Sequence, residues 1–144
     1  MKIIIAGGSG HVGAVLRRGL ARPDRELVVL SRSDKPLPDA NRVVAWDGET
    51  LGDWAAEIDG ADVVINLAGR SVDCRYHARN LAEMMESRLR STTVIGRAIA
   101  RAKKPPRLWL QASTATIYAH RFDAPNDEID GILGGDEPDA PPKW

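Results

Sequence analysis

The sequence has little cysteine, no surplus charge and no long apolar run, and each absence excludes a class of protein. Its 144 residues include one cysteine, Cys74, which cannot form an internal disulfide and suits a reducing cytoplasm. The 20 basic and 20 acidic residues balance, which argues against nucleic acid or an anionic membrane as a partner. No apolar run approaches the roughly 20 residues that cross a bilayer, and the chain opens on a strand pattern without a secretory signal.

The three histidines, His11, His77 and His120, stand far apart among polar neighbours. No grouping of His, Cys, Asp and Glu has the spacing of metal ligands, so we predict no metal site. What remains is a globular domain, 43% hydrophobic, which we expect to be cytoplasmic.

Short apolar runs alternate with helical stretches along the chain. This alternation predicts an α/β fold of the Rossmann type, a doubly wound parallel sheet covered on both faces. The predicted strands are residues 3–6, 26–31, 42–46, 61–67 and 107–112, and the predicted helices are residues 11–21, 51–58 and 77–103.

A glycine turn joins the first predicted strand to the first predicted helix, which is the context of a dinucleotide-binding motif. Gly7 allows a tight turn, Gly10 allows a pyrophosphate to approach the backbone, and Gly13 allows the helix to pack closely. The helix N-terminus then presents N–H groups and a positive dipole to the phosphates. The remaining residues of this loop are further candidates for cofactor contact, with a solvated helix start as the alternative for His11: Ser9, His11 and Val12.

The end of the second predicted strand indicates which nicotinamide cofactor is favoured. A carboxylate there would accept the ribose 2′-hydroxyl of NAD, whereas a basic residue can bind a 2′-phosphate. Arg32 offers a planar charge suited to phosphate, flanked by the hydroxyls of Ser31 and Ser33. We therefore predict NADP in preference to NAD, with Asp34 keeping NAD open.

Three further strand ends carry candidate site residues. Asp47 follows the third strand, where its carboxylate could accept from an adenine amino group or form an Asp-Gly turn. The fourth strand ends in small residues that let a ribose or nicotinamide lie close: Asn66, Leu67, Ala68 and Gly69. Hydroxyls at the fifth, Ser113 and Thr114, suit either a clamp on a substrate oxygen or local turn chemistry.

A change of composition follows these motifs. Residues 119–144 hold seven acidic residues, four prolines and three glycines with little periodicity. We predict an NAD(P)-binding domain over residues 1–118 and an irregular acidic segment over residues 119–144.

Together the motifs resemble the extended short-chain dehydrogenase/reductase superfamily, in particular its sugar-nucleotide epimerase and dehydratase group and the branch called epimerase family protein. The matching motifs are Ala6-Gly7-Gly8-Ser9-Gly10-His11-Val12-Gly13, Ile65-Asn66-Leu67-Ala68-Gly69, Ser87-Arg88 with Ser91 and Thr92, and Ser113-Thr114-Ala115-Thr116-Ile117-Tyr118. The resemblance places the catalytic hydroxyl at Thr114, beside Ser113. It implies hydride transfer on a sugar-nucleotide-like substrate.

The chain departs from that superfamily in lacking its Tyr-x-x-x-Lys pair. The only tyrosines, Tyr76 and Tyr118, are followed four residues later by Asn80 and Phe122. Members of the superfamily are about twice as long, so the resemblance implies that the C-terminal part of the fold and the substrate lobe are missing. A fragment of this kind would expose one face of its sheet and self-associate or be fragile.

Two classes of function stay open. One is the cofactor-binding half of an NADP-dependent epimerase, dehydratase or reductase, itself inactive for want of the Tyr-x-x-x-Lys pair. The other is a non-catalytic NADP-binding sensor or interaction module.

Overall fold

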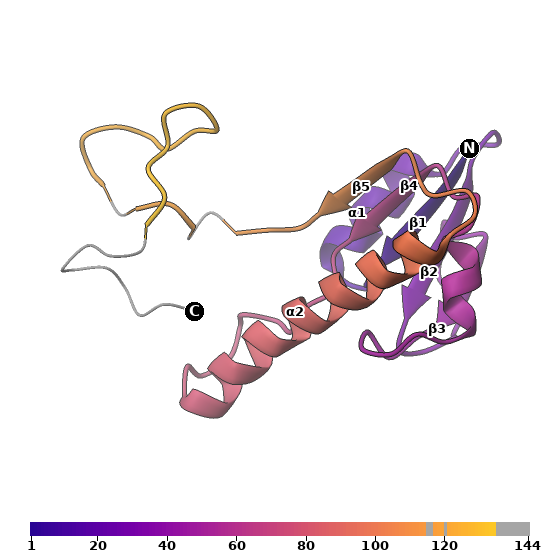
Figure 1. The fold of residues 1–144 in the computed structure, drawn as a ribbon, viewed down its shortest axis with the longest axis horizontal. Helices are drawn as coiled ribbons and strands as arrows, with labels where there is room; N and C mark the ends of the chain where they lie inside the picture. The colour runs from indigo at the N-terminus through magenta and orange to yellow at the C-terminus, as the bar shows by residue number, and fades with distance from the viewer. Residues whose placement is uncertain (115–116, 120, 135–144) are drawn as a thin grey trace. The chain divides into compact units, whose positions relative to one another are not determined.

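The computed structural model describes residues 1–114, 117–119 and 121–134, and the predicted α/β fold is confirmed there (Figure 1). All strands of the sheet are parallel, in the order β3-β2-β1-β4-β5. Their bounds are Lys2–Ala6 for β1, Glu26–Ser31 for β2, Arg42–Ala45 for β3, Val63–Asn66 for β4 and Leu108–Gln111 for β5. The order reverses between β1 and β4, the position at which sheets of this kind bind ligands.

Helices cover both faces of the sheet because side chains alternate along each strand. Ile3, Ile5 and Leu27 point to the face covered by helix α1 (His11–Leu20). Ile4 and Val28 are in the larger core on the other face, which also contains Trp54 of the 3-10 helix η1 (Asp53–Glu57) and residues of helix α2 (Ala78–Arg101). Figure 1 shows α2 running from the sheet to well beyond its edge, and its buried apolar residues lie mostly in its C-terminal half.

Two elements differ from the sequence prediction. The helix predicted over residues 51–58 is a five-residue 3-10 helix. Within it, the indole N–H of Trp54 donates to the Thr50 carbonyl at 2.9 Å and the ring packs edge-on against Trp46. Strand β5 is exposed along its length, whereas a strand buried on both faces was expected. It is the edge strand of the described sheet, so one of its sides has no neighbour there.

The chain divides into two compact units, Met1–Ala112 and Ser113–Trp144. In the second unit, Tyr118 pairs with Leu133 in an isolated antiparallel bridge, and the Ala119 N–H donates to the Ile132 carbonyl at 2.7 Å. The domain boundary predicted after residue 118 stays a prediction. Residues 115–116, 120 and 135–144, which include part of the predicted hydroxyl motif and His120, lie outside the described residues.

The larger core predicts a contrast between two residues of α2. Ile95 is fully buried, whereas Leu89 is 54% exposed. We expect Ile95→Ala to lower the free energy of unfolding by about 2–5 kcal/mol, because it leaves a cavity, and Leu89→Ala to change it by less than about 1 kcal/mol. Urea denaturation measures both, and equal losses would contradict the packing described.

Candidate functional site

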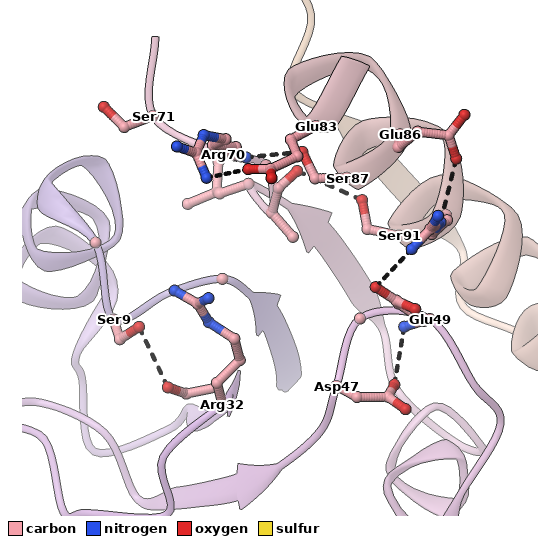
Figure 2. A pocket seen from close by; sticks show the side chains of 18 of the residues that line it. Ser9, Arg32, Asp47, Glu49, Arg70, Ser71, Glu83, Glu86, Ser87 and Ser91 are labelled. Carbon is pink, nitrogen blue, oxygen red and sulfur yellow. Dashed lines mark hydrogen bonds and ion pairs between the residues drawn. The ribbon is translucent and has the colours of Figure 1, made fainter. Parts of the chain in front are cut away.

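A cavity of about 810 Å³ opens where β1, β2, β3 and β4 end, and its lining residues all belong to the first unit (Figure 2). This volume falls within the roughly 300–1,000 Å³ typical of small-molecule sites. Many residues predicted to contact a cofactor line it: Gly7, Ser9, Gly10, Ser31, Arg32, Asp47, Leu67, Ala68 and Gly69. The carboxyl ends of the strands therefore form one concave site.

The three glycines of the turn meet different constraints. Gly7 has φ +71°, and a Cβ there would lie 2.8 Å from the backbone of Ala68. A Cβ on Gly13 would lie 2.2 Å from the Gly8 carbonyl oxygen, so the helix packs on the turn itself. At Gly10 a Cβ would meet only the Gly7 oxygen at 3.7 Å, although Gly10 lines the cavity. The protein's own packing therefore does not require glycine at position 10, and the space there is open to a ligand.

The N-terminus of α1 adjoins this open space. Gly10 is its N-cap and offers no side-chain hydrogen bond, and the first turn contains no acidic residue. The first N–H groups of a helix have no partner within the helix, so those of His11, Val12 and Gly13 are suited to bind an anion. These three residues do not line the cavity, and a contact from His11 or Val12 to a cofactor stays a prediction.

The end of β2 forms a wall rich in hydroxyls. The Ser31 hydroxyl donates to Ser9 Oγ at 3.2 Å and accepts the Ser33 N–H at 3.3 Å. Arg32 lines the cavity, and no carboxylate in the described part of the chain pairs with it. Ser33 and Asp34 do not line the cavity. An unpaired guanidinium beside hydroxyl donors is suited to bind a phosphate.

Asp47 caps the turn that follows β3. Its carboxylate accepts the N–H groups of Glu49 at 2.8 Å and Thr50 at 2.9 Å and the Thr50 hydroxyl at 2.5 Å. The Thr50 hydroxyl, followed by the two backbone N–H groups, lowers the pKa of Asp47 to about 2. The turn-forming role is therefore present, and a contact from Asp47 to adenine stays a prediction.

Asn66 acts inside the protein, because its side chain is fully buried and does not line the cavity. Its amide nitrogen donates to Gln111 Oε1 at 2.9 Å, and its oxygen accepts the Ala68 N–H at 3.0 Å. The neighbouring Leu67, Ala68 and Gly69 do line the cavity. Asn66 thus fixes the turn whose backbone faces Gly7.

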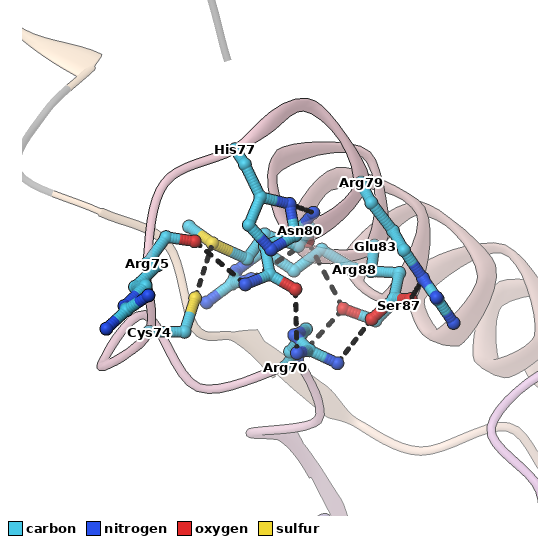
Figure 3. A network of polar contacts seen from close by, with 10 residues as sticks. Arg70, Cys74, Arg75, His77, Arg79, Asn80, Glu83, Ser87 and Arg88 are labelled. Carbon is cyan, nitrogen blue, oxygen red and sulfur yellow. Dashed lines mark hydrogen bonds and ion pairs between the residues drawn. The ribbon is translucent and has the colours of Figure 1, made fainter.

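Helix α2 and the segment after β4 form a wall that sequence reasoning missed (Figure 3). Arg70 pairs with Glu83 and donates to Asn80 Oδ1 at 3.0 Å, and its backbone N–H donates to Ser87 Oγ at 2.8 Å. A hydrogen bond from Arg79, followed by the charge of Arg70, lowers the pKa of Glu83. Ser87, noted in the sequence for its resemblance, therefore anchors the segment after β4 onto α2.

The same wall continues toward β3 through ion pairs. Arg90 of α2 pairs with Glu86 at 3.2 Å and with Glu49 at 3.0 Å. Glu49 lines the cavity, as does Trp46, which precedes it by three residues in the sequence. The i,i+4 spacing of Glu86 and Arg90 could have indicated the first pair. Nothing in the sequence indicated the pair with Glu49, which joins residues 41 positions apart.

Ser113 and Thr114 are exposed and belong to the second unit. Neither residue is among those that line the cavity. Their assignment as catalytic hydroxyls stays a prediction.

Two features are absent from the residues that the structure describes. No three His, Cys, Asp or Glu side chains among them come together as a group that could hold a metal ion. No helix within the same residues has the length and apolar character needed to cross a membrane.

Comparison with known proteins shows which family the chain belongs to. The model of the NAD dependent epimerase/dehydratase family matches residues 3–133. This chain belongs to that family. The epimerase family protein SDR39U1 of Bos taurus is 31% identical over 131 residues, which cover 89% of this chain and 42% of the relative. The epimerase family protein YfhF of Bacillus subtilis is 33% identical over 122 residues, which cover 82% and 39%. The chain thus spans about two-fifths of the length of these relatives.

Solved structures of the epimerase family show the same fold. Human epimerase family protein SDR39U1, solved with NADPH, is 28% identical with a TM-score of 0.70, over 86% of this chain and 40% of that one. UDP-N-acetylglucosamine 4-epimerase from Bacillus cereus is 21% identical with a TM-score of 0.68, over 92% and 42%. The second likeness concerns the fold alone.

The contact between Gly7 and Ala68 predicts a contrast between two glycines. Gly7 and Gly60 both have positive φ, but a Cβ on Gly60 meets nothing within 4 Å. We expect Gly60→Ala to cost about 1–2 kcal/mol from φ alone, and Gly7→Ala to cost at least about 2 kcal/mol more because it also clashes with backbone. Urea denaturation compares them, and equal losses would show that the two turns are not in contact.

The Asp47 turn predicts a change in titration. Thr50→Val removes the hydroxyl that most strongly lowers the pKa of Asp47, so we expect that pKa to rise from about 2 toward 3.8. Because the folded pKa lies below the unfolded value, the stabilisation is present above about pH 4 and is lost as the pH falls toward 2. A carboxyl-detected NMR titration measures this, and an unchanged pKa in the variant would disprove the assigned cause.

Proposed function

We propose that this chain is the NADP(H)-binding part of an enzyme of the epimerase/dehydratase family. One observation carries the proposal: the same cavity adjoins the N-terminus of α1, which has no side-chain cap, and is lined by Arg32, whose guanidinium has no carboxylate partner among the described residues. The first feature suits a pyrophosphate and the second a 2′-phosphate. The solved human relative that carries NADPH supports this choice.

The residues present fit such a cofactor in distinct ways. Gly10 leaves room for a pyrophosphate, and the N–H groups of the first turn of α1 would hold it. Arg32, with the hydroxyls of Ser31 and Ser9, would hold the 2′-phosphate, which NAD lacks. The carboxylate that could favour NAD, Asp34, does not line the cavity. The nicotinamide cofactor, when bound, supplies the site's capacity to accept or donate hydride.

The reaction we propose is hydride transfer at a hydroxyl-bearing carbon of a sugar-nucleotide-like substrate. Family membership supports this, as does the shared fold of a solved UDP-N-acetylglucosamine 4-epimerase, whose own substrate is a sugar nucleotide. Thr114, or Ser113 beside it, would orient the reacting oxygen. Neither tyrosine of the 144 residues has a lysine four positions later, so we expect these residues alone to bind the cofactor without turnover.

A second candidate is a non-catalytic NADP-binding sensor or interaction module, which the same lack of a Tyr-x-x-x-Lys pair favours. The protein that contains these residues can be assayed for turnover of UDP-sugars with NADP⁺, the oxidised cofactor that accepts the hydride from the hydroxyl-bearing carbon. Turnover supports the enzyme, and tight NADPH binding without turnover supports the module.

The proposal predicts a cofactor-selective effect of Arg32→Glu. Replacing the guanidinium by a carboxylate repels a 2′-phosphate, so we expect NADPH affinity to fall by more than about tenfold and NADH affinity by less than about threefold. Fluorescence titration with both cofactors measures this. Arg22→Glu makes the same charge change at an exposed arginine outside the cavity and serves as the control. Equal losses for both cofactors, or no loss, would refute the assignment of Arg32.

A further inference from the structure

Arg17 is a buried cation without an acidic partner in the described part of the chain. It lies in the last turn of α1 and is 5% exposed. Its Nη1 donates to the Gly8 carbonyl oxygen, and its Nε donates to the Pro38 carbonyl at 2.9 Å. Burying a guanidinium is costly, and the two carbonyls accept hydrogen bonds from two of its five N–H groups without neutralising its charge. We therefore looked for a function of the buried Arg17 guanidinium that would account for its desolvation cost.

The two carbonyls belong to the two segments that flank the proposed phosphate subsites. Gly8 is in the glycine turn, and Pro38 is in the connection between β2 and β3 that begins with Arg32 and Ser33. Because Arg17 holds both, it fixes one segment relative to the other. A guanidinium can do this because its donors form a rigid fork, whereas an ammonium is a point charge.

The bond to Gly8 also sets the direction of a donor. The Gly8 carbonyl and the Ser9 N–H belong to one trans peptide unit, in which they point to opposite sides. With the carbonyl held by Arg17, the Ser9 N–H points away from that guanidinium. Ser9 lines the cavity and accepts the hydroxyl hydrogen bond of Ser31.

We propose that Arg17 is a positioning residue of the cofactor site, which ties the glycine turn to the segment after β2 and thereby sets the geometry of the 2′-phosphate subsite. Arg17 does not line the cavity, so it acts through Ser9, Arg32 and the backbone between them. This inference rests on the proposed binding of NADP(H). It adds a residue that no cofactor motif of the sequence contained.

The experiment compares Arg17→Met and Arg17→Lys with Arg18→Met, an exposed arginine on the same helix. The melting point of each variant of the full chain is first measured by circular dichroism. Each variant is then titrated with NADPH and with NADH by fluorescence at a temperature below that melting point. We expect Arg17→Met to weaken NADPH by about tenfold or more and NADH by no more than about threefold, with Arg18→Met like wild type. Arg17→Lys should behave like Arg17→Met, because one ammonium cannot hold both carbonyls.

A double-mutant cycle with Arg32→Ala separates positioning from general destabilisation. If Arg17 acts through the subsite of Arg32, Arg17→Met in the Arg32→Ala background should change NADPH affinity by no more than about threefold. The ratio of the NADPH and NADH dissociation constants refers to folded molecules and is insensitive to a lower stability.

Each of the following results would overturn the inference. Equal weakening of both cofactors, or the same loss of NADPH affinity in both backgrounds, would give Arg17 a merely structural role. Full recovery in Arg17→Lys would show that charge alone matters. If wild type binds NADPH and Arg17→Met binds it equally well, this inference fails while the proposed function stands. If wild type binds neither cofactor, both fail.

Discussion

The candidate site depends on a backbone-to-backbone contact between the turns that follow β1 and β4. Gly7 lies so close to Ala68 that no Cβ fits between them, and the Gly7 N–H donates to the Leu30 carbonyl at 2.9 Å. Asn66 holds the Ala68 N–H from within the sheet. Three adjacent strands therefore end against one another, and the cavity and the N-terminus of α1 take their positions from that junction.

The charges around the cavity are distributed unequally. On the α2 side, acids and arginines pair with one another, as Glu83 does with Arg70 and Arg79. On the α1 side, Arg17 is buried and Arg32 lines the cavity, both without a carboxylate partner in the described residues. The dipole of α1 adds positive potential at its N-terminus. An anion in this cavity is thus favoured at the α1 side, where the glycine turn gives it room.

The sequence predicted what depends on local pattern. Alternating apolar runs determined the strands, and the glycines marked the turn that lines the cavity, because both signals lie within a few residues. Long-range contacts carry no such signal. Nothing in the sequence distinguished the buried Arg17 from an exposed arginine on the same helix. The pair between Arg90 and Glu49 joins segments far apart in the chain. Nor did the sequence indicate that the Asn66 side chain is hydrogen-bonded to Gln111 and Ala68, and a contact from Asn66 to the cofactor stays a prediction.

The most direct test of a nucleotide site at this junction is an amide-resolved NMR titration of the chain with NADPH and then with NADH. We predict saturable shifts of the Gly7–Gly13 amides with both cofactors, and shifts of the Arg32 and Ser33 amides chiefly with NADPH. Saturable binding that shifts amides elsewhere and leaves these unchanged would contradict this prediction. So would the absence of any shift with either cofactor from a folded chain.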